Sequence, residues 1–357
     1  MRLADYLHLF LEGGPGLVQL AVTNACNAHC RFCSFPQVPA HAVTMADPAR
    51  LSRGLAALRQ RGSYYITFTG GEPLLYPHLL DAVARARELG LGTILVTNGA
   101  LLTAPLLKEL RQAGLACLII SLDAASPAAH DWNRGLPGLT RRIQALLPLA
   151  RQLGFSPVAS VTLSRLIDDL EALPGFIKHL GFERLLFSYP LTSLASSYLG
   201  YAPHPLVHFS SRELDELFGR LLVLKRHAPL AILNSRQALL DLRNRLRRRP
   251  RRFPCLAGYK HFYVDWHLNV YRCHVLPHSL GPLEEIHRAP PVRDACDACI
   301  SECYRDASVY QYLAQSMADF LEAWRRGRWL RGLAVLLHPY NFLSLADLLS
   351  DGRRWVG

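Results

Sequence analysis

The sequence predicts an α/β protein built as a partial (βα)6 barrel, an incomplete TIM-like barrel, with a cysteine-rich C-terminal extension. Three observations predict this architecture. Short apolar runs alternate with helical patterns from residue 17 to about residue 190. The runs are apolar or β-branched almost throughout, which is typical of parallel strands that are buried on both faces. Five of the nine cysteines follow residue 252, in a segment with little helical periodicity.

Six strands and five helices make up the predicted barrel. The strands are expected at residues 17–22, 64–69, 93–97, 118–122, 158–163 and 184–188. The helices are expected at residues 47–61, 77–89, 103–113, 138–153 and 168–180. Alternating strands and helices indicate βαβ units with right-handed crossovers. Six units are too few to close an eight-stranded barrel, so we expect an open one.

We divide the chain into five parts. Residues 1–16 precede the barrel, and residues 17–190 form it. Residues 191–252 are a helical connection, with helices at 212–227 and 235–249 and an arginine-rich run at 243–252. Residues 253–310 form a cysteine-rich domain. A helix predicted at 308–331 leads into an amphipathic helical tail, residues 311–357.

The composition favours an anionic partner and a reducing compartment. The formal net charge is +12, and most of the excess is arginine. This balance favours a phosphorylated substrate, a nucleic acid or a membrane surface as partner. The first residues are not a secretory signal, and no window holds the roughly 18 consecutive apolar residues of a membrane span. We therefore expect a cytoplasmic protein, in which clustered cysteines indicate metal binding or catalysis and not disulfides.

The first cysteine group reads Cys26-x3-Cys30-x2-Cys33 and lies just past the first predicted strand. In parallel α/β folds, ligands gather at this carboxyl end of the strands. Three thiolates hold three irons of a cubane cluster and leave the fourth iron open to a ligand. A zinc site that takes His29 as its fourth ligand is the alternative for this spacing.

Polar motifs follow three further strands at the same end. Gly70-Gly71-Glu72-Pro73 follows the second strand, Thr97-Asn98-Gly99 ends the third, and Ser121-Leu122-Asp123 ends the fourth. The two glycines let the backbone approach a ligand closely. The carboxylate of Glu72 is able to hold an ammonium group. Ordinary loop polarity does not usually place polar groups at the ends of four successive strands.

In combination, these motifs resemble the radical S-adenosylmethionine (SAM) superfamily over residues 17–190, and Asp131 with Arg134-Gly135 resembles a further element of that family. The resemblance implies that Cys26, Cys30 and Cys33 ligate a [4Fe–4S] cluster whose open iron chelates SAM. It implies that Gly70, Gly71 and Glu72 hold the SAM amino group. It places Ser121 and Asp123 near the ribose or carboxylate of SAM, and Phe32 beside the adenine. Asn98 and Arg134 complete the implied SAM-binding residues.

The resemblance also implies the reaction. One electron from the reduced cluster, supplied by a flavodoxin or ferredoxin, cleaves SAM to methionine and a 5′-deoxyadenosyl radical, which abstracts hydrogen from a substrate. The protein orients the reactants and excludes water. The substrate class stays open between a peptide, a lipid or isoprenoid, and a sugar, and no catalytic residue is singled out. The alternative function is a non-catalytic zinc or iron–sulfur binding module that docks on anionic surfaces.

The second cysteine group consists of Cys255, Cys273, Cys296, Cys299 and Cys303. Residues 264–273 are predicted to form a hairpin that delivers Cys273 at its end. Four thiolates suffice for a second cubane, for rubredoxin-like iron or for a structural zinc ion. The arrangement resembles the SPASM and twitch auxiliary-cluster domains, except that Leu268 replaces the usual glycine before the hairpin cysteine. The resemblance implies one [4Fe–4S] cluster, held by Cys255, Cys273 and two or three of the last three cysteines.

Other features have plainer interpretations. Cys117 opens a strand and is predicted to be a small buried hydrophobe. The arginine run at 243–252 is predicted to be a solvated face. With Trp324, Trp329 and the basic turn at 325–331, it is also able to form a peripheral membrane or anionic-substrate surface. Nucleic-acid binding is less favoured, because stacking aromatics are not interleaved with the basic residues.

Overall fold

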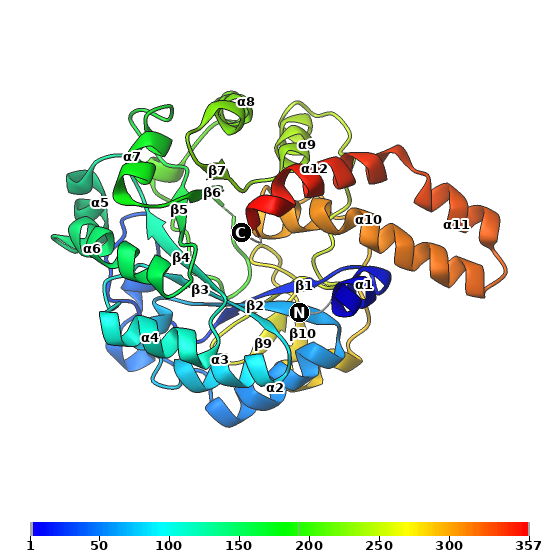
Figure 1. Cartoon of the computed structure of the whole chain (residues 1–357), viewed down its shortest axis with the longest axis horizontal. Coiled ribbons are helices and arrows are strands. Elements are labelled where there is room, and N and C mark those ends of the chain that lie inside the picture. Colours follow the sequence, from blue (N-terminus) through cyan, green and yellow to red (C-terminus); the bar gives the residue numbers. More distant parts are fainter. Residues whose placement is uncertain (1–2, 192, 356–357) are drawn as a thin grey trace.

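Parallel strands form the centre of the computed structural model, which describes residues 3–191 and 193–355 (Figure 1). They are β1 (Gly16–Ala21), β2 (Ser63–Thr69), β3 (Gly92–Thr97), β4 (Cys117–Leu122), β5 (Val158–Thr162), β6 (Arg184–Ser188) and β7 (Ala231–Ile232). The strands lie in sequence order in one sheet, and each pairs in parallel with its neighbours. β1 to β6 match the predicted strands, and β7 is an additional short strand. The predicted α/β class with a partial parallel barrel is confirmed.

The cysteine-rich segment continues this sheet and does not form a separate one. β8 (Phe262–Val264) pairs in parallel with β1, and β9 (Asn269–Tyr271) and β10 (Ser279–Pro282) follow in antiparallel order. The turn between β8 and β9 contains Leu268, whose φ of 63° lies in the left-handed region that glycine favours. Cys273 follows shortly after the end of β9, so the hairpin delivers this thiol as predicted.

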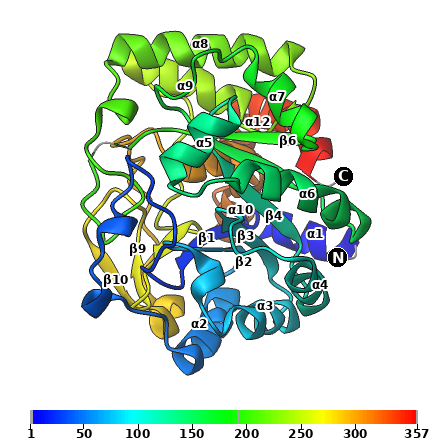
Figure 2. The same ribbon diagram turned by 90° about the vertical axis from the view of Figure 1, so that its left-hand side faces the viewer.

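Helices cover the outer face of the sheet (Figures 1 and 2). They are α2 (Pro48–Gln60), α3 (Leu79–Glu88), α4 (Ala104–Ala113), α6 (Leu139–Gln152), α7 (Leu173–Leu180) and α8 (Ser211–His227). Local signals set their starts: the Asp47 carboxylate caps α2, and Ser210 with Glu213 forms a capping box on α8. α7 begins later than predicted, because the Asp169 carboxylate binds the next backbone N–H groups in a turn.

The two faces of the barrel sheet differ in burial. In β3, Leu95 is buried beneath the helices, whereas Ile94 and Val96 on either side of it are half-buried. Ser160 in β5 and Ser188 in β6 are also only half-buried. The prediction that the strands are buried on both faces therefore holds for β4, where Leu118, Ile119 and Ile120 are all buried, and is wrong for β3 and for the carboxyl ends of β5 and β6. The physical reason is that a partial barrel leaves its interior open, and polar side chains line that interior towards the carboxyl ends.

Three helices complete the described chain: α10 (Glu302–Arg325), α11 (Trp329–Leu336) and α12 (Pro339–Trp355). α10 packs against α1 (Leu3–Leu11), and α11 lies at the outer end of an arm beyond the barrel (Figure 1). The single helix predicted at 308–331 is wrong, because the helix breaks after Arg325, where Gly327 has a φ of 70°. Among the described residues, no single helix is long and apolar enough to cross a membrane. α11 and residues 339–350, bent by 45°, reach that length and composition together.

Candidate active site

The first cysteine group lies in the loop between β1 and α2, at the carboxyl end of the sheet. Its three thiols are partly exposed and lie close enough to influence one another electrostatically. Burial is the main cause that raises the pKa of Cys30 to about 11 and of Cys33 to about 12, and the neighbouring thiols add to both shifts. Three thiolates can therefore persist together only beside positive charge, which bound iron would supply.

The Gly70-Gly71 turn supports this loop from behind. Gly71 donates its N–H to the carbonyl of Thr23 at 2.9 Å, and Glu72 donates to the carbonyl of Ala25 at 2.7 Å. A Cβ on Gly70 would lie 2.3 Å from the Thr23 carbonyl oxygen, and a Cβ on Gly71 would lie 2.1 Å from that of Ala25. The glycines thus allow close approach to the chain's own backbone just before the cysteines, and not only to a ligand as the sequence suggested.

Glu72 is fully buried, and its carboxylate joins two strand ends. It accepts hydrogen bonds from the Thr97 hydroxyl at 2.7 Å and from the backbone N–H groups of Asn98 at 2.8 Å and Leu74 at 3.1 Å. Burial raises the pKa of this carboxyl group, and the hydrogen bonds oppose the shift. These contacts give Glu72 a positioning role, and its contact with the amino group of SAM stays a prediction.

A buried ion pair fixes the other side of the loop. Arg134, at the end of α5 (Pro127–Arg134), donates two hydrogen bonds of 2.7 Å to Asp123, and Asn133 donates a third at 2.8 Å. Burial alone would raise the pKa of Asp123, but Arg134 outweighs it and holds that pKa well below its usual range. The same turn binds the cysteine loop, because Asn133 accepts from the N–H of Arg31 and the Arg134 carbonyl from the N–H of His29.

The remaining predicted SAM-binding residues surround this loop. The buried Asn98 donates its side-chain amide to Asn27 in the loop at 2.8 Å. Phe32 is buried, and its carbonyl accepts the N–H of Ala202 at 2.8 Å. Ser121 is half-buried near the end of β4. The structure therefore brings the predicted SAM-binding residues to one end of the barrel, and their contacts with SAM stay predictions.

The donor set of this loop fits a cubane cluster. A zinc ion draws its ligands to within about 2.3 Å of one point, whereas each thiolate of a cubane binds a different iron. Among the described residues, no three His, Cys, Asp or Glu side chains converge as ligands of a single ion. His29, the fourth ligand of the zinc alternative, is exposed, and its side chain lies beside Gly135. Three thiols without a fourth protein donor match a cubane with one open iron.

Four cysteines of the second group line one small cavity: Cys255, Cys273, Cys296 and Cys299. Three arginines, Arg251, Arg272 and Arg305, line the same cavity. The Nε and Nη1 groups of Arg251 and Arg305 are buried without a hydrogen-bond partner in the described part of the chain. Burial is the main cause that raises the pKa of Cys299 to about 12. Orphaned guanidinium donors beside four thiols fit an anionic group in the cavity, as an iron–sulfur cluster on thiolates would be.

The arginine run at 243–252 is solvated at residues 247–250, as predicted, but other arginines of the run hold this cavity together. Arg245 and Arg251 donate to the carbonyl of Asp297 at 2.8 and 2.9 Å, and Arg251 donates to that of Cys299 at 2.7 Å. Two further arginines of the run bind Asp215 of α8. The positioning roles of Arg245 and Arg251 could not be predicted from the sequence, because their acceptors are backbone carbonyls that no side-chain pattern reveals. The only sequence feature that pointed to these roles was the high number of arginines just before the second cysteine group.

Cys303 lies outside this cavity, near the start of α10. Its thiol is partly exposed and lies 3.5 Å from Oε1 of Glu302. The buried carboxylate of Glu302 accepts hydrogen bonds from the Ser188 hydroxyl at 2.7 Å and from the backbone N–H of Tyr189 at 3.1 Å. The Ser188 hydroxyl also contacts the Tyr201 hydroxyl at 2.8 Å. A polar group thus lies at the carboxyl end of β6, beside the fifth cysteine.

Aromatic side chains fill the space between the two cysteine groups. Tyr198 packs against the same apolar cluster as Cys33 of the first group and stacks on His274, with ring centroids 3.8 Å apart. His274 contacts Tyr304 at a centroid distance of 5.3 Å, and Tyr304 lines the second cysteine cavity. Residues 195–202 also form backbone hydrogen bonds to the chain beside both cysteine groups. The two groups therefore belong to one packed unit.

The family model of the Radical SAM superfamily matches residues 20–169, which hold the first cysteine loop and the strand-end motifs. This segment of the chain belongs to the radical SAM superfamily. Radical SAM proteins bind a [4Fe–4S] cluster and SAM, which agrees with the donor set of the loop. An AdoMet-dependent heme synthase of Methanosarcina barkeri is 31% identical over 175 residues, 48% of this chain and 49% of that protein. The chain spans about half the length of the curated relatives it matches.

Solved structures extend the likeness beyond the radical SAM barrel. anSMEcpe with bound AdoMet has a TM-score of 0.57 at 15% identity, and the match covers 87% of this chain and 98% of that one. SuiB of Streptococcus suis bound to the precursor peptide SuiA has a TM-score of 0.56 at 14% identity, over 80% of this chain and 64% of that one. At these identities the likeness shows the fold. It includes most of the C-terminal extension.

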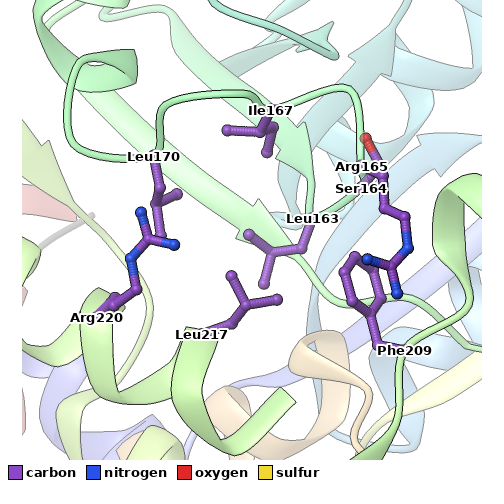
Figure 3. Close-up of a pocket in the computed structure, with 8 residues that line it drawn as sticks. All are labelled: Leu163, Ser164, Arg165, Ile167, Leu170, Phe209, Leu217 and Arg220. Atoms are coloured by element: carbon purple, nitrogen blue, oxygen red, sulfur yellow. The ribbon is translucent and has the colours of Figure 1, made fainter. Parts of the chain in front are cut away.

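The cavity in Figure 3 lies apart from both cysteine groups. It measures about 240 Å³ and lies between the loop after β5 and α8. Five of its eight lining residues are apolar, and two arginines lie on opposite sides. Both are already paired, Arg165 with Glu213 at 2.7 Å and Arg220 with Glu171. This cavity therefore offers no thiol or uncompensated charge for the chemistry of the family.

Proposed function

We propose that this chain is a radical SAM enzyme that holds a [4Fe–4S] cluster on Cys26, Cys30 and Cys33, with SAM at the open iron. When bound, the cluster and SAM supply a one-electron reductive cleavage to methionine and a 5′-deoxyadenosyl radical, which takes a hydrogen atom from a substrate C–H bond. The observation that carries the proposal is the thiol loop at the carboxyl end of β1. Hydrogen bonds fix this loop on one side to the Gly70-Gly71 turn and on the other side to the last turn of α5.

The chain's own residues position this site and add positive charge beside its thiols. Glu72 holds the end of β3 beside the loop, and Asn98 joins that end to the loop itself. Arg134 lies close enough to Cys26 and Cys30 to lower the pKa of both thiols against the effect of burial. Its positive charge therefore favours the thiolates that iron requires.

We also propose that Cys255, Cys273, Cys296 and Cys299 hold a second [4Fe–4S] cluster, and that Cys303 is not a ligand. The four thiols line one cavity, whereas Cys303 lies outside it. The orphaned N–H groups of Arg251 and Arg305 point to an anionic centre there. Hydrogen bonds of this kind from outside the ligand sphere tune the electronic properties of a metal centre.

The proposed substrate site lies between the two cysteine groups, at the carboxyl end of β6. Ser188, Tyr201 and Glu302 form a hydrogen-bonded group there, with Cys303 beside it. A peptide is the first substrate class to test, since SuiB was solved with its precursor peptide SuiA. Lipids and sugars follow in the same assay.

The cytoplasm is the proposed compartment, with a flavodoxin or ferredoxin as the electron donor. All nine cysteines of the sequence are free thiols in the structure. A reducing compartment keeps such thiols available to iron.

Iron content of matched variants tests both cluster assignments. The protein reconstituted without oxygen is expected to hold about eight irons per chain, as two cubanes require. Alanine at Cys26, Cys30 and Cys33 together, or Cys273→Ser, is expected to lower the content to about four irons. Cys303→Ser is the matched control and is expected to leave it unchanged. SAM is expected to change the electron paramagnetic resonance spectrum of reduced Cys273→Ser protein, which keeps only the first cluster.

Two outcomes would contradict these assignments. A Cys303→Ser variant that loses as much iron as Cys273→Ser would place Cys303 among the cluster ligands. A loaded and reduced Cys273→Ser protein whose spectrum does not respond to SAM would exclude the open-iron site. That result would favour the non-catalytic binding module.

A further inference from the structure

α12, the last helix of the described chain, turns polar side chains towards the protein and apolar side chains outward. α12 buries three polar side chains, Asn341, Ser344 and Asp347, against the body of the protein. Ser344 donates to the carbonyl of Val309 at 2.6 Å, and Asp347 accepts from the Ser235 hydroxyl at 2.5 Å. The inward face of α12 is therefore held by hydrogen bonds and not by apolar packing alone.

The opposite face of α12 is apolar and exposed. Phe342, Leu345, Ala346 and Leu349 follow the i, i+3, i+4, i+7 spacing of a single helix face. Phe342 exposes 64% of its surface. A surface helix of a globular protein normally turns its apolar side chains inward and its polar ones outward. The reversed pattern indicates that the outer face of α12 has an apolar partner outside this chain.

α11 adds a second exposed apolar face. Gly332 faces α10, where a Cβ would lie 3.0 Å from the Phe320 ring. Leu330, Ala334 and Leu337 lie on the opposite side of the helix, and Leu330 and Leu337 expose 66% and 65% of their surface. Figure 1 shows α11 at the outer end of the arm. We call the exposed apolar residues of α11 and α12, together with Leu337, the arm surface.

Positive charge and tryptophan border the arm surface. Four exposed arginines lie in the short stretch from the end of α10 into α11: Arg325, Arg326, Arg328 and Arg331. Within the described residues, only Arg326 forms an ion pair, with Glu322 at 2.7 Å. Trp324 and Trp329 are exposed in the same stretch. Tryptophan at an apolar boundary and arginine near anionic headgroups are typical of helices that lie in a membrane interface.

We propose that the arm surface docks on the anionic face of a phospholipid bilayer. The leucine and phenylalanine side chains would enter the acyl boundary, while the arginines contact anionic headgroups. This partner matches both the apolar face and its positive border. A second copy of the chain would bring the same four arginines against one another, which like-charge repulsion opposes. The net charge of +12 adds long-range attraction to an anionic membrane.

The α11 part of the arm surface lies far from the cysteine groups, whereas α12 returns along α10 towards its start. α10 starts beside Cys303, and its 24 residues span about 36 Å at roughly 1.5 Å per residue. The membrane would therefore hold the protein by its arm, with α11 farthest from the proposed substrate site. This docking is independent of the proposed reaction, because it involves none of the cysteine ligands.

Co-sedimentation of the intact, cluster-loaded protein with lipid vesicles tests the docking. We expect binding to vesicles of equal parts phosphatidylcholine and phosphatidylglycerol, with at least about tenfold weaker binding to phosphatidylcholine alone. Added salt is expected to weaken the binding, because it screens the arginines. Binding of the Cys26, Cys30 and Cys33 alanine variant should equal that of wild type, which separates docking from cluster assembly.

Variants of the arm test its two components separately. Leu330→Ser combined with Leu337→Ser is expected to weaken binding to the anionic vesicles at least about tenfold, because two exposed apolar side chains are lost. Glutamine at Arg325, Arg328 and Arg331 is expected to remove the preference for anionic lipid. Val223→Ser on α8 is the matched control, since Val223 exposes 60% of its surface outside the arm. It should bind as wild type does.

Several results would overturn the docking. Wild-type protein that stays in the supernatant with both vesicle types would exclude it, as would a Val223→Ser control that loses as much binding as the leucine variant. A wild-type dimer that the leucine variant splits, without vesicle binding, would assign the arm surface to contact between two copies. If the leucine variant fails to fold, as judged by circular dichroism, the arginine variant still decides the question.

Discussion

Asp123 and Arg134 are both buried, and each is the charged partner of the other. Attraction between such charges offsets their loss of hydration only when the geometry is good and further hydrogen bonds complete it. Here the contact has two hydrogen bonds of 2.7 Å, and Asn133 adds a third. The family resemblance implied that both residues bind SAM. Their pairing with each other could not be predicted from the sequence, because it depends on how α5 folds back over the end of β4.

Asp123→Ala is expected to lower the free energy of unfolding by about 3 to 5 kcal/mol, because Arg134 then keeps a buried charge without its partner. Urea unfolding monitored by circular dichroism measures this loss. Glu216→Ala, which removes the exposed ion pair with Arg212, is the control and should have little effect. Equal losses in the two variants would contradict a structural role for the buried pair.

His261 is fully buried, and its Nδ1 accepts the backbone N–H of Leu17 at 3.1 Å. Burial, followed by the nearby charge of Lys260, lowers the pKa of His261 to about 3. The unfolded chain, with a histidine pKa of about 6.5, binds a proton in the window between these values that the folded protein does not bind. Stability contributed by neutral His261 is therefore lost as pH falls through this window.

His261→Asn is expected to reduce this acid sensitivity, because the asparagine oxygen replaces Nδ1 as acceptor without titrating. The melting temperature of wild type should fall more than that of the variant between about pH 7 and about pH 5. Thermal unfolding of both proteins at the two pH values measures the difference. Parallel decreases in the two proteins would show that other groups cause the acid sensitivity.

At the scale of elements, the two cysteine loops show what local sequence signals can and cannot predict. The position of Cys26 past β1 and of Cys273 past β9 follows from strand patterns next to each cysteine. The hydrogen bonds from Arg245 and Arg251 to the loop of the second group could not be predicted in this way, because they join segments that are far apart in the chain. Leu268 is an exception to the local preference for glycine at a left-handed φ. Its left-handed φ costs about 1–2 kcal/mol, and its fully buried side chain outweighs this with about 2–5 kcal/mol of packing.

Gly71→Ala is expected to displace the first cysteine loop. The added Cβ would lie 2.1 Å from the carbonyl oxygen of Ala25, and backbone cannot move aside without moving Cys26. We expect the iron content of the reconstituted variant to fall towards about four per chain. Gly175→Ala in α7 is the control, because its Cβ would have no atom within 4 Å.

The control is also expected to gain about 0.5–1 kcal/mol in the free energy of unfolding, because alanine suits a helix better than glycine. Iron analysis together with urea unfolding measures both effects. A Gly71→Ala protein with full iron content would show that the tight packing of the turn is not needed for the cluster.

At the scale of the whole molecule, the sequence predicted the barrel and missed how its parts join. Apolar runs with helices between them are local patterns, so β1 to β6 were predictable. The parallel pairing of β8 with β1 depends on contacts between residues more than 200 positions apart, as between Val18 and Phe262. The reversed polarity of α12 is also a whole-molecule property. Periodicity identifies an apolar face, but only packing shows that this face points outward.

The central claim is that the thiol loop of this chain supports cleavage of SAM. Mass spectrometry of 5′-deoxyadenosine, after incubation of the reduced and anaerobically reconstituted protein with SAM, tests it most directly. We expect 5′-deoxyadenosine and methionine in equal amounts from wild type. The variant with alanine at Cys26, Cys30 and Cys33 should form neither product. Loaded, reduced wild-type protein that forms no 5′-deoxyadenosine would contradict the claim.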